Sequence, residues 1–306
     1  MPYVFGPIPS RRLGFSLGID LIPAKICTYD CLYCQVGKTT KKTIAMEAYV
    51  PITGVLEEIE RKLDESAPDV ITFSGSGEPT LNTEIDQVIA HVKKLSGIKI
   101  AILTNGSLLW KKEVRERIAG VDIIMPTLST AFAETFSAIH RPYPALDLAV
   151  IIDGIITLRR EFRGSLNLEV VLLSGFNDSD REVEGLKSVI NRISPDKIQL
   201  NTVVRPPVDS IAKALDKKKL ENIKNFFGPQ TEIIADVSFD SKNHQYNSLK
   251  SAIMEMTRRR PMRSSDVSKI LNTGQDETED LIKGLLIKGY LKKQEYSGEV
   301  FYSSKG

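Results

Sequence analysis

Apolar runs typical of buried strands alternate with amphipathic helical patterns along most of the chain. The predicted strands cover residues 15–22, 69–75, 98–106, 121–129, 166–175 and 196–204. The predicted helices cover residues 52–65, 84–95, 111–119, 147–162, 181–193 and 212–227. This alternation predicts an α/β fold with a parallel sheet built from βα units. Six units could form a doubly wound open sheet or a partial (β/α) barrel, and in both the binding groups gather at the carboxyl ends of the strands.

The pattern changes at about Ser248, where strands give way to helices. The predicted helices of this part cover residues 248–260, 264–271 and 276–291. Two short β-like runs around Ser297 and Gly298 then predict a hairpin. This order is that of a winged helix, so we expect one domain over residues 1–240 and a small winged-helix-like domain over residues 248–306.

Composition adds few constraints. Hydrophobic residues make up 42% of the 306 positions and charged residues 26%, which is ordinary for a globular protein. No apolar run is long enough to cross a membrane, and the N-terminus lacks the pattern of a signal peptide, so we expect a cytoplasmic protein with no membrane association. From Lys250 onward, eleven Lys or Arg stand against eight Asp or Glu, which makes this part mildly basic although the net charge is only +2.

All three cysteines, Cys27, Cys31 and Cys34, lie close together in one polar segment. Thiols that only pack in a core would be scattered through the strands, and an odd number disfavours a disulfide framework. A structural zinc site needs a fourth ligand, and no His follows at finger spacing. Three thiolates on a short loop can instead hold three irons of a [4Fe-4S] cluster and leave the fourth iron open to an outside ligand.

Cys27, Cys31, Tyr33 and Cys34 match the Cys-x3-Cys-x-aromatic-Cys motif, and the chain resembles the radical S-adenosylmethionine (radical SAM) enzymes. The resemblance implies that the free iron binds SAM, that an external electron donor reduces the cluster, and that a 5′-deoxyadenosyl radical abstracts hydrogen from a substrate. It implies a partial (β/α)6 TIM-type barrel over about residues 1–235. It also implies that Tyr33 borders the adenine of SAM.

The resemblance continues after the second predicted strand. Gly75, Ser76, Gly77 and Glu78 look like the family's Gly-Gly-Glu motif, with Ser76 where the first glycine usually stands. In the family this strand end hydrogen-bonds the amino group of SAM, and backbone carbonyls can do so with a serine present. The alternative is an ordinary turn between a strand and a helix.

Three later strands add one implied SAM contact each. Asn105, in a Thr-Asn-Gly segment, is implied to face the methionine or ribose of SAM, although Asn-Gly is also a good turn. Ser129 corresponds to the family's serine near the SAM carboxylate. Glu169 could reach the two ribose hydroxyls, or it could be an outward, solvated charge.

The segment before the cysteines most resembles a branch of iron–sulfur oxidoreductases related to the wyosine tRNA-modifying enzymes. Because the chain has no further cysteine, we expect no second cluster bound through cysteine, and therefore a different substrate. Arginines before the first strand, at 141 and at 205 could meet a phosphate or carboxylate at the barrel mouth, or could fix loops. No catalytic residue is assigned, and Tyr29, His140 and Arg205 are candidates by position alone.

Two macromolecular substrates remain open. The first is RNA, in particular tRNA, docked by the winged-helix-like domain through the basic run that includes residues 258–260. The second is a protein or peptide held by the same domain, because four acids at the start of the helix over 276–291 would repel phosphates. A third possibility is a structural or electron-transferring cluster without SAM cleavage.

Overall fold

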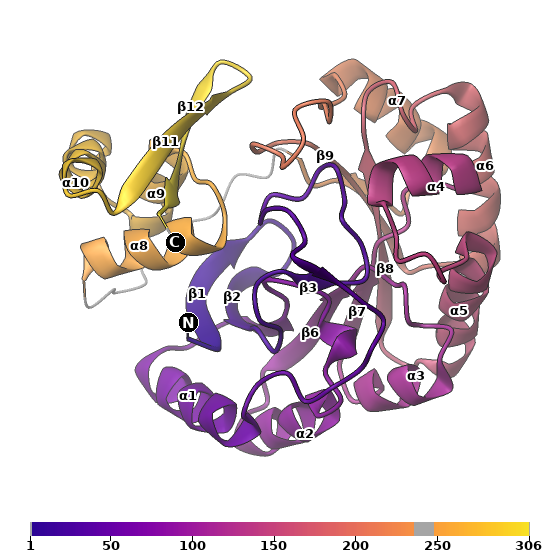
Figure 1. Ribbon diagram of the computed structural model, residues 1–306, viewed down its shortest axis with the longest axis horizontal. Helices are drawn as coiled ribbons and strands as arrows, with labels where there is room; N and C mark the ends of the chain where they lie inside the picture. The colour runs from indigo at the N-terminus through magenta and orange to yellow at the C-terminus, as the bar shows by residue number, and fades with distance from the viewer. Residues whose placement is uncertain (1, 236–247, 306) are drawn as a thin grey trace.

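In the computed structural model, which describes residues 2–235 and 248–305, an eight-stranded sheet has helices packed around it (Figure 1). Its spatial order is β1-β2-β5-β6-β7-β8-β9-β10. The strands are β1 (Val4–Ser10), β2 (Gly14–Ile19), β5 (Val70–Phe73), β6 (Lys99–Thr104), β7 (Ile123–Pro126), β8 (Ser165–Leu172), β9 (Lys197–Thr202) and β10 (Thr231–Ile233). Strands β2 to β10 pair in parallel. The six predicted strands and their parallel order are therefore confirmed, as a partial barrel.

The helices between these strands cover the outside of the sheet in Figure 1. They are α1 (Ile52–Glu65), the 3₁₀ turn η1 (Pro79–Leu81), α2 (Ile85–Leu95), α3 (Lys112–Ile118), α4 (Ala133–His140), α5 (Leu148–Glu161), α6 (Asp180–Ile193) and α7 (Lys217–Phe227). Each predicted helix of this region is observed, and α4 was not predicted. In α1 the buried residues Val55 and Ile59 lie one turn apart, so the apolar stripe faces the sheet.

Strand β1 is an antiparallel edge strand that the sequence analysis did not predict. It pairs with β2, with an irregularity between Phe5 and Ile8. Its other side is covered by the C-terminal part of the chain, because Phe5 and Ile8 belong to the same hydrophobic cluster as Ile253 and Met256. The Glu255 side chain also accepts a hydrogen bond from the Gly6 N–H at 2.7 Å. The edge of the sheet is therefore the surface on which the C-terminal part docks.

We call residues 248–305 the C-terminal unit. It consists of α8 (Leu249–Arg259), α9 (Ser264–Leu271), α10 (Gln275–Ile287) and the antiparallel hairpin of β11 (Leu291–Tyr296) and β12 (Glu299–Ser304). The predicted order of helices and hairpin is observed, and Ser297 and Gly298 at the turn have positive φ angles of 52° and 76°, as a two-residue hairpin loop requires. The winged-helix assignment stays a prediction, and the predicted boundary at residue 240 lies outside the described residues.

No helix in the described part of the chain combines the length and the apolar character that a membrane span requires.

Candidate active site at the cysteine loop

The three cysteines follow β2: Cys27 ends the two-residue strand β3 (Ile26–Cys27), and Cys31 and Cys34 lie on the loop between β3 and β4 (Lys41–Lys42). Backbone hydrogen bonds hold this loop from two directions. The Leu32 N–H donates to the carbonyl of Ile139 at the end of α4 (2.9 Å), and the Cys34 carbonyl accepts from Val208 N–H (3.1 Å), in the segment after β9. The loop is thus fixed at the carboxyl ends of the barrel strands, where the sequence placed the chemistry.

Each sulfur has a polar neighbour. Lys25 Nζ donates to Cys34 Sγ at 3.0 Å, and Asn105 Nδ2 lies 3.6 Å from Cys27 Sγ. Burial and the nearby charge of Glu78 raise the pKa of the Cys27 thiol to about 11. Burial lowers the pKa of Lys25, but attraction to Cys34 outweighs it, so that the pKa is raised. The loop therefore combines the Cys27 thiol, which stays protonated without a metal, with a fixed cation, and a bound metal would displace the thiol proton.

The spacing of the thiols distinguishes between two kinds of metal centre. Within residues 2–235 and 248–305, no three His, Cys, Asp or Glu side chains converge so as to hold one metal ion. A tetrahedral zinc site needs such convergence, whereas each thiolate of an iron–sulfur cluster binds a different iron. Three free thiols on one loop are a donor set that the expected iron–sulfur cluster could use.

The Gly75–Glu78 segment lies directly beside this loop. A Cβ on Gly77 would lie 1.9 Å from the carbonyl oxygen of Ile26, so glycine is required for the approach of the two segments. Ser76 donates to Asp20 Oδ2 from its N–H (3.0 Å) and from its hydroxyl (2.6 Å). The serine that replaces the family's glycine therefore binds a carboxylate at the end of β2.

Asp20 in turn pairs with the C-terminal unit. Arg259 Nη1 lies 2.6 Å from Asp20 Oδ2, and the two side chains are only 9% and 8% exposed. Arg259 also donates to the Pro2 carbonyl (2.8 Å) and stacks over the Phe5 ring. The sequence analysis did not predict this contact. Its only signal was Asp20, an acidic residue within the mostly apolar predicted strand over residues 15–22. The contact ties the C-terminal unit to the strand end implied to bind SAM.

Glu78 joins the ends of β5 and β6. Its carboxylate accepts from the hydroxyls of Thr80 and Thr104, both at 2.6 Å, and from the Asn105 N–H at 2.7 Å. Burial raises the pKa of Glu78, although these hydrogen bonds act in the opposite direction. The Asn105 side chain then donates to Thr28 of the cysteine loop at 2.7 Å. The structure thus brings Glu78 and Asn105 to the cysteines.

His140, at the end of α4, contacts two loop residues. Its Nδ1 lies 3.4 Å from both Cys31 Sγ and the Tyr33 hydroxyl. Burial lowers the pKa of His140 to about 3, so the ring is neutral at pH 7. Tyr29 packs against Phe136 and the same imidazole in the hydrophobic core. Of the three candidates based on position, His140 therefore lies at the cysteines, Tyr29 fills the core, and Arg205 donates to Gln35, which follows Cys34.

Glu169 and Ser129 occupy different surroundings. Glu169 pairs with Arg12 at 3.2 Å and accepts from Asn201 at 3.0 Å. Burial, and after it the charges of Cys31 and Glu169, raise the pKa of Tyr33, which places Glu169 within electrostatic reach of the loop. Ser129 is fully buried, and its hydroxyl accepts from the Val171 N–H at 3.1 Å, so the structure does not bring it to the cysteines. The SAM contacts of both residues stay predictions.

Comparison with known proteins agrees with this geometry. The family model of the Radical SAM superfamily matches residues 21–184. A UPF0026 protein of Methanocaldococcus jannaschii is 32% identical over 99% of this chain and 96% of its own length. A protein of Brachyspira hyodysenteriae named GTPase Obg is 34% identical over 98% of this chain, which spans 45% of that protein.

A solved structure shows the same fold. The crystal structure of a radical SAM methyltransferase from Sphaerobacter thermophilus superposes with a TM-score of 0.54 at 15% identity, over 71% of this chain and 65% of that one. The family model covers more than half of the chain, and the cysteine motif lies inside it. This chain belongs to the radical SAM superfamily.

Proposed function

We propose that this protein binds one [4Fe-4S] cluster through Cys27, Cys31 and Cys34, uses SAM as its second cofactor, and modifies RNA, with tRNA the form that we expect. When bound, the cluster and SAM would supply a 5′-deoxyadenosyl radical that abstracts hydrogen from the substrate. The observation that carries the proposal is a single loop presenting three free thiols at the carboxyl ends of the barrel strands.

The chain's own residues would orient and tune this centre. Lys25 holds a positive charge 3.0 Å from Cys34 Sγ, where it would offset part of the negative charge of a bound cluster. Asn105 points an N–H group at Cys27 Sγ, and hydrogen bonds to cluster sulfurs are among the factors that set its reduction potential. Glu78 fixes the backbone of Asn105, and the predicted SAM contacts of Tyr33, Gly75, Ser76 and Gly77 belong to the same region.

RNA is supported by the position of the basic residues. The run Arg258–Arg260 lies at the junction between the C-terminal unit and the cysteine loop, because Arg258, Arg260 and Cys34 line one cavity. Cations that track a phosphate backbone supply most of the affinity of nucleic-acid binding. A substrate held there would lie beside the proposed cluster.

A protein substrate is the second candidate, and one observation favours it. The first turns of α10 expose four acids, namely Asp276, Glu277, Glu279 and Asp280. This surface would repel RNA and attract a basic polypeptide. We would test this by pull-down. If one specific polypeptide is retained by the protein, is lost when these four acids are neutralised, and is still retained when Arg258 is neutralised, a protein substrate is favoured over RNA.

Anaerobic reconstitution tests the chemistry. We expect about four irons and four sulfides per chain, and 5′-deoxyadenosine after addition of dithionite and SAM. Cys31→Ser should lose both, because one of three cluster ligands is gone, whereas Lys38→Gln, an exposed change in the same loop, should keep both. A protein that takes up the cluster but forms no 5′-deoxyadenosine would contradict the proposal and indicate a structural or electron-transferring centre.

A further inference from the structure

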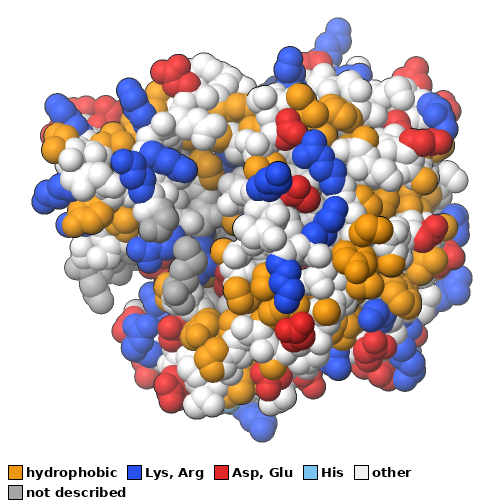
Figure 2. Space-filling view, in the orientation of Figure 1, with side chains coloured by type: hydrophobic (Ala, Val, Ile, Leu, Met, Phe, Trp, Pro, Cys, Tyr) orange, Lys and Arg blue, Asp and Glu red, His pale blue; other side chains and the backbone are white. Residues whose placement is uncertain are grey.

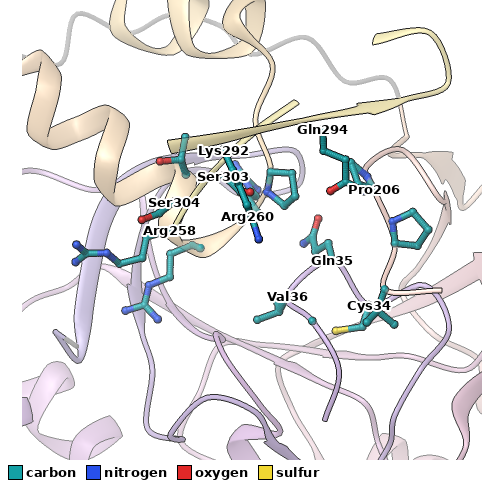
Figure 3. A pocket seen from close by; sticks show the side chains of 16 residues that line it. Cys34, Gln35, Val36, Pro206, Arg258, Arg260, Lys292, Gln294, Ser303 and Ser304 are labelled. Atoms are coloured by element: carbon teal, nitrogen blue, oxygen red, sulfur yellow. The ribbon is translucent and has the colours of Figure 1, made fainter. Parts of the chain in front are cut away.

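A cavity of about 230 Å³ lies between the cysteine loop and the C-terminal unit. Figure 3 shows Cys34 and Gln35 on one side and Arg258, Arg260 and Lys292 on the other. We infer that this cavity is a phosphate-binding subsite that receives a backbone phosphate of the RNA substrate. The inference rests on the proposed function and adds where the substrate is held.

The charge of the cavity lining is the first argument. Among the described residues that line it are four cations, Arg258, Arg259, Arg260 and Lys292, and no Asp or Glu. Arg259 is already committed to Asp20. The other three take part in no ion pair within the described residues. Figure 2 shows Lys and Arg side chains, with Asp and Glu among them, at the upper left, where the C-terminal unit lies. Three unpaired cations around one hollow favour a polyanion.

Two buried arginine Nε–H groups without a hydrogen-bond acceptor are the second argument. The Nε atoms of Arg205 and Arg260 are buried and have no hydrogen-bond partner in the part of the chain that the structure describes. Arg260 uses Nη2 to donate to the Pro9 carbonyl (3.0 Å), and Arg205 uses Nη1 to donate to Gln35 (3.3 Å), which lines the cavity. A buried charge without an opposite charge is costly. A phosphate bound in the cavity would offset the charge of Arg260, which lines it, because arginine binds phosphate through several N–H groups.

The nearby acids offset this charge only in part, because each is already paired with another arginine. Asp266 binds Arg263 through both carboxylate oxygens, at 2.9 and 3.0 Å, and Glu169 binds Arg12. Burial, and next to it repulsion from Arg260, lowers the pKa of Arg205 to about 9. Between the cysteine loop and the C-terminal unit, the described arginines therefore outnumber the acids that could pair with them. This agrees with the two Nε–H groups that lack an acceptor.

The position of the cavity connects it to the chemistry. Cys34 lines it, and the neighbouring segment Pro206–Val208, which also lines it, is hydrogen-bonded to the Cys34 carbonyl. A phosphate held here would lie next to the cysteine loop, so an adjacent nucleotide could reach the barrel mouth. For RNA, the proposed substrate, Arg260 would hold one phosphate in the cavity, and the exposed cations Arg258 and Lys292 could contact the next phosphate of the same strand.

The test compares two doubly neutralised variants of the reconstituted protein. R258Q/K292Q removes two exposed cations of the cavity, whereas K269Q/K293Q removes two exposed cations of the same unit that do not line it. Lys293 follows Lys292 in β11, so its side chain points to the opposite face of the hairpin. The two variants have equal net charge, and equal thermal melting would show that both are folded.

The probe is fluorescein-labelled total tRNA, with binding measured between about 50 and 200 mM salt. For R258Q/K292Q we expect binding about tenfold weaker, and a slope of log affinity against log salt reduced by about 1.4, since each lost contact to single-stranded RNA removes about 0.7. For K269Q/K293Q we expect less than about a twofold change, because these residues contact no phosphate of the subsite.

Three other results would each refute a specific claim. Equal weakening in the two variants would show diffuse surface attraction and would refute the subsite while leaving the RNA proposal in place. If wild-type protein bound no tRNA at low salt but still formed 5′-deoxyadenosine, the RNA substrate and the subsite would both fail and the SAM chemistry would stand. Binding of polyglutamate alone, lost in R258Q/K292Q, would identify an acidic polypeptide as the occupant and refute the RNA subsite.

Discussion

Two groups of polar side chains at the cysteine loop differ in how completely their charges and hydrogen bonds are balanced. Around Glu78, the carboxylate accepts from Thr80, Thr104 and Asn105, all within the barrel. Around Arg260, buried N–H groups lack partners among the described residues and the cations exceed the acids. Side chains whose hydrogen bonds are all made within the protein can hold one another in place. Side chains with unused donors and unbalanced charge can in addition bind a ligand. We therefore assign positioning to the first group and substrate binding to the second.

The largest expected effect concerns the ion pair between Asp20 and Arg259, which joins the barrel beside Ser76 to the C-terminal unit. Asp20→Ala leaves Arg259 buried without its carboxylate and removes the acceptor of Ser76, so we expect a loss of about 3–5 kcal/mol in the free energy of unfolding, measured with urea. Asp153→Ala breaks an exposed pair with Arg192 and should cost less than about 1 kcal/mol. Equal losses would show that the contact between the C-terminal unit and β2 contributes little.

Glu78→Gln should have an intermediate effect. One carboxylate oxygen becomes an NH₂ group that faces existing donors, so at least one buried hydrogen bond is lost, at a cost of about 1–3 kcal/mol in unfolding free energy. Because Asn105 would lose its fixed position, the yield of 5′-deoxyadenosine should also fall. A variant with normal yield would show that the Glu78 network does not position the site.

The smallest expected effect is the pH dependence at Glu169. Burial alone would raise the pKa of Glu169, but attraction to Arg12 and hydrogen bonds from Asn201 and Thr127 outweigh it, so that the pKa lies below its usual range. A carboxyl with a lowered folded pKa stabilises the protein above its unfolded pKa of about 4.3, and this stabilisation is lost as the pH falls through the folded value.

The difference in unfolding free energy between wild-type protein and Glu169→Gln should therefore be largest near neutral pH and shrink below about pH 4. Urea unfolding at several pH values measures it. A difference that does not change with pH would mean that Glu169 is not held as the charged form by Arg12.

Most of the barrel could be predicted because each βα unit carries its own local pattern. The cysteine motif could be predicted for the same reason, since its three cysteines and the aromatic residue lie within one short segment. Strand β1 was missed because Pro7 and Pro9 interrupt its pattern, which an edge strand tolerates. Helix α4 was missed because it has only 8 residues, too few to show a clear helical period.

Contacts between distant parts of the chain could not be predicted. Asp20 and Arg259 are 239 positions apart, and neither residue stands out in its local pattern. Ser129 was matched by its place after a strand, but the structure uses its hydroxyl to bind the backbone of β8. The cavity is lined by residues from five separate stretches of the chain, and only folding brings the cations of residues 258–260 and Lys292 to the cysteine loop.

The most direct test of the central claim is hydrogen transfer from the RNA. Reconstituted protein would be given dithionite, SAM and tRNA from cells grown in deuterated medium, and the 5′-deoxyadenosine would be analysed by mass spectrometry. We predict deuterium in its methyl group, because the radical takes hydrogen from the substrate. Abundant 5′-deoxyadenosine without deuterium would contradict the assignment of RNA as substrate.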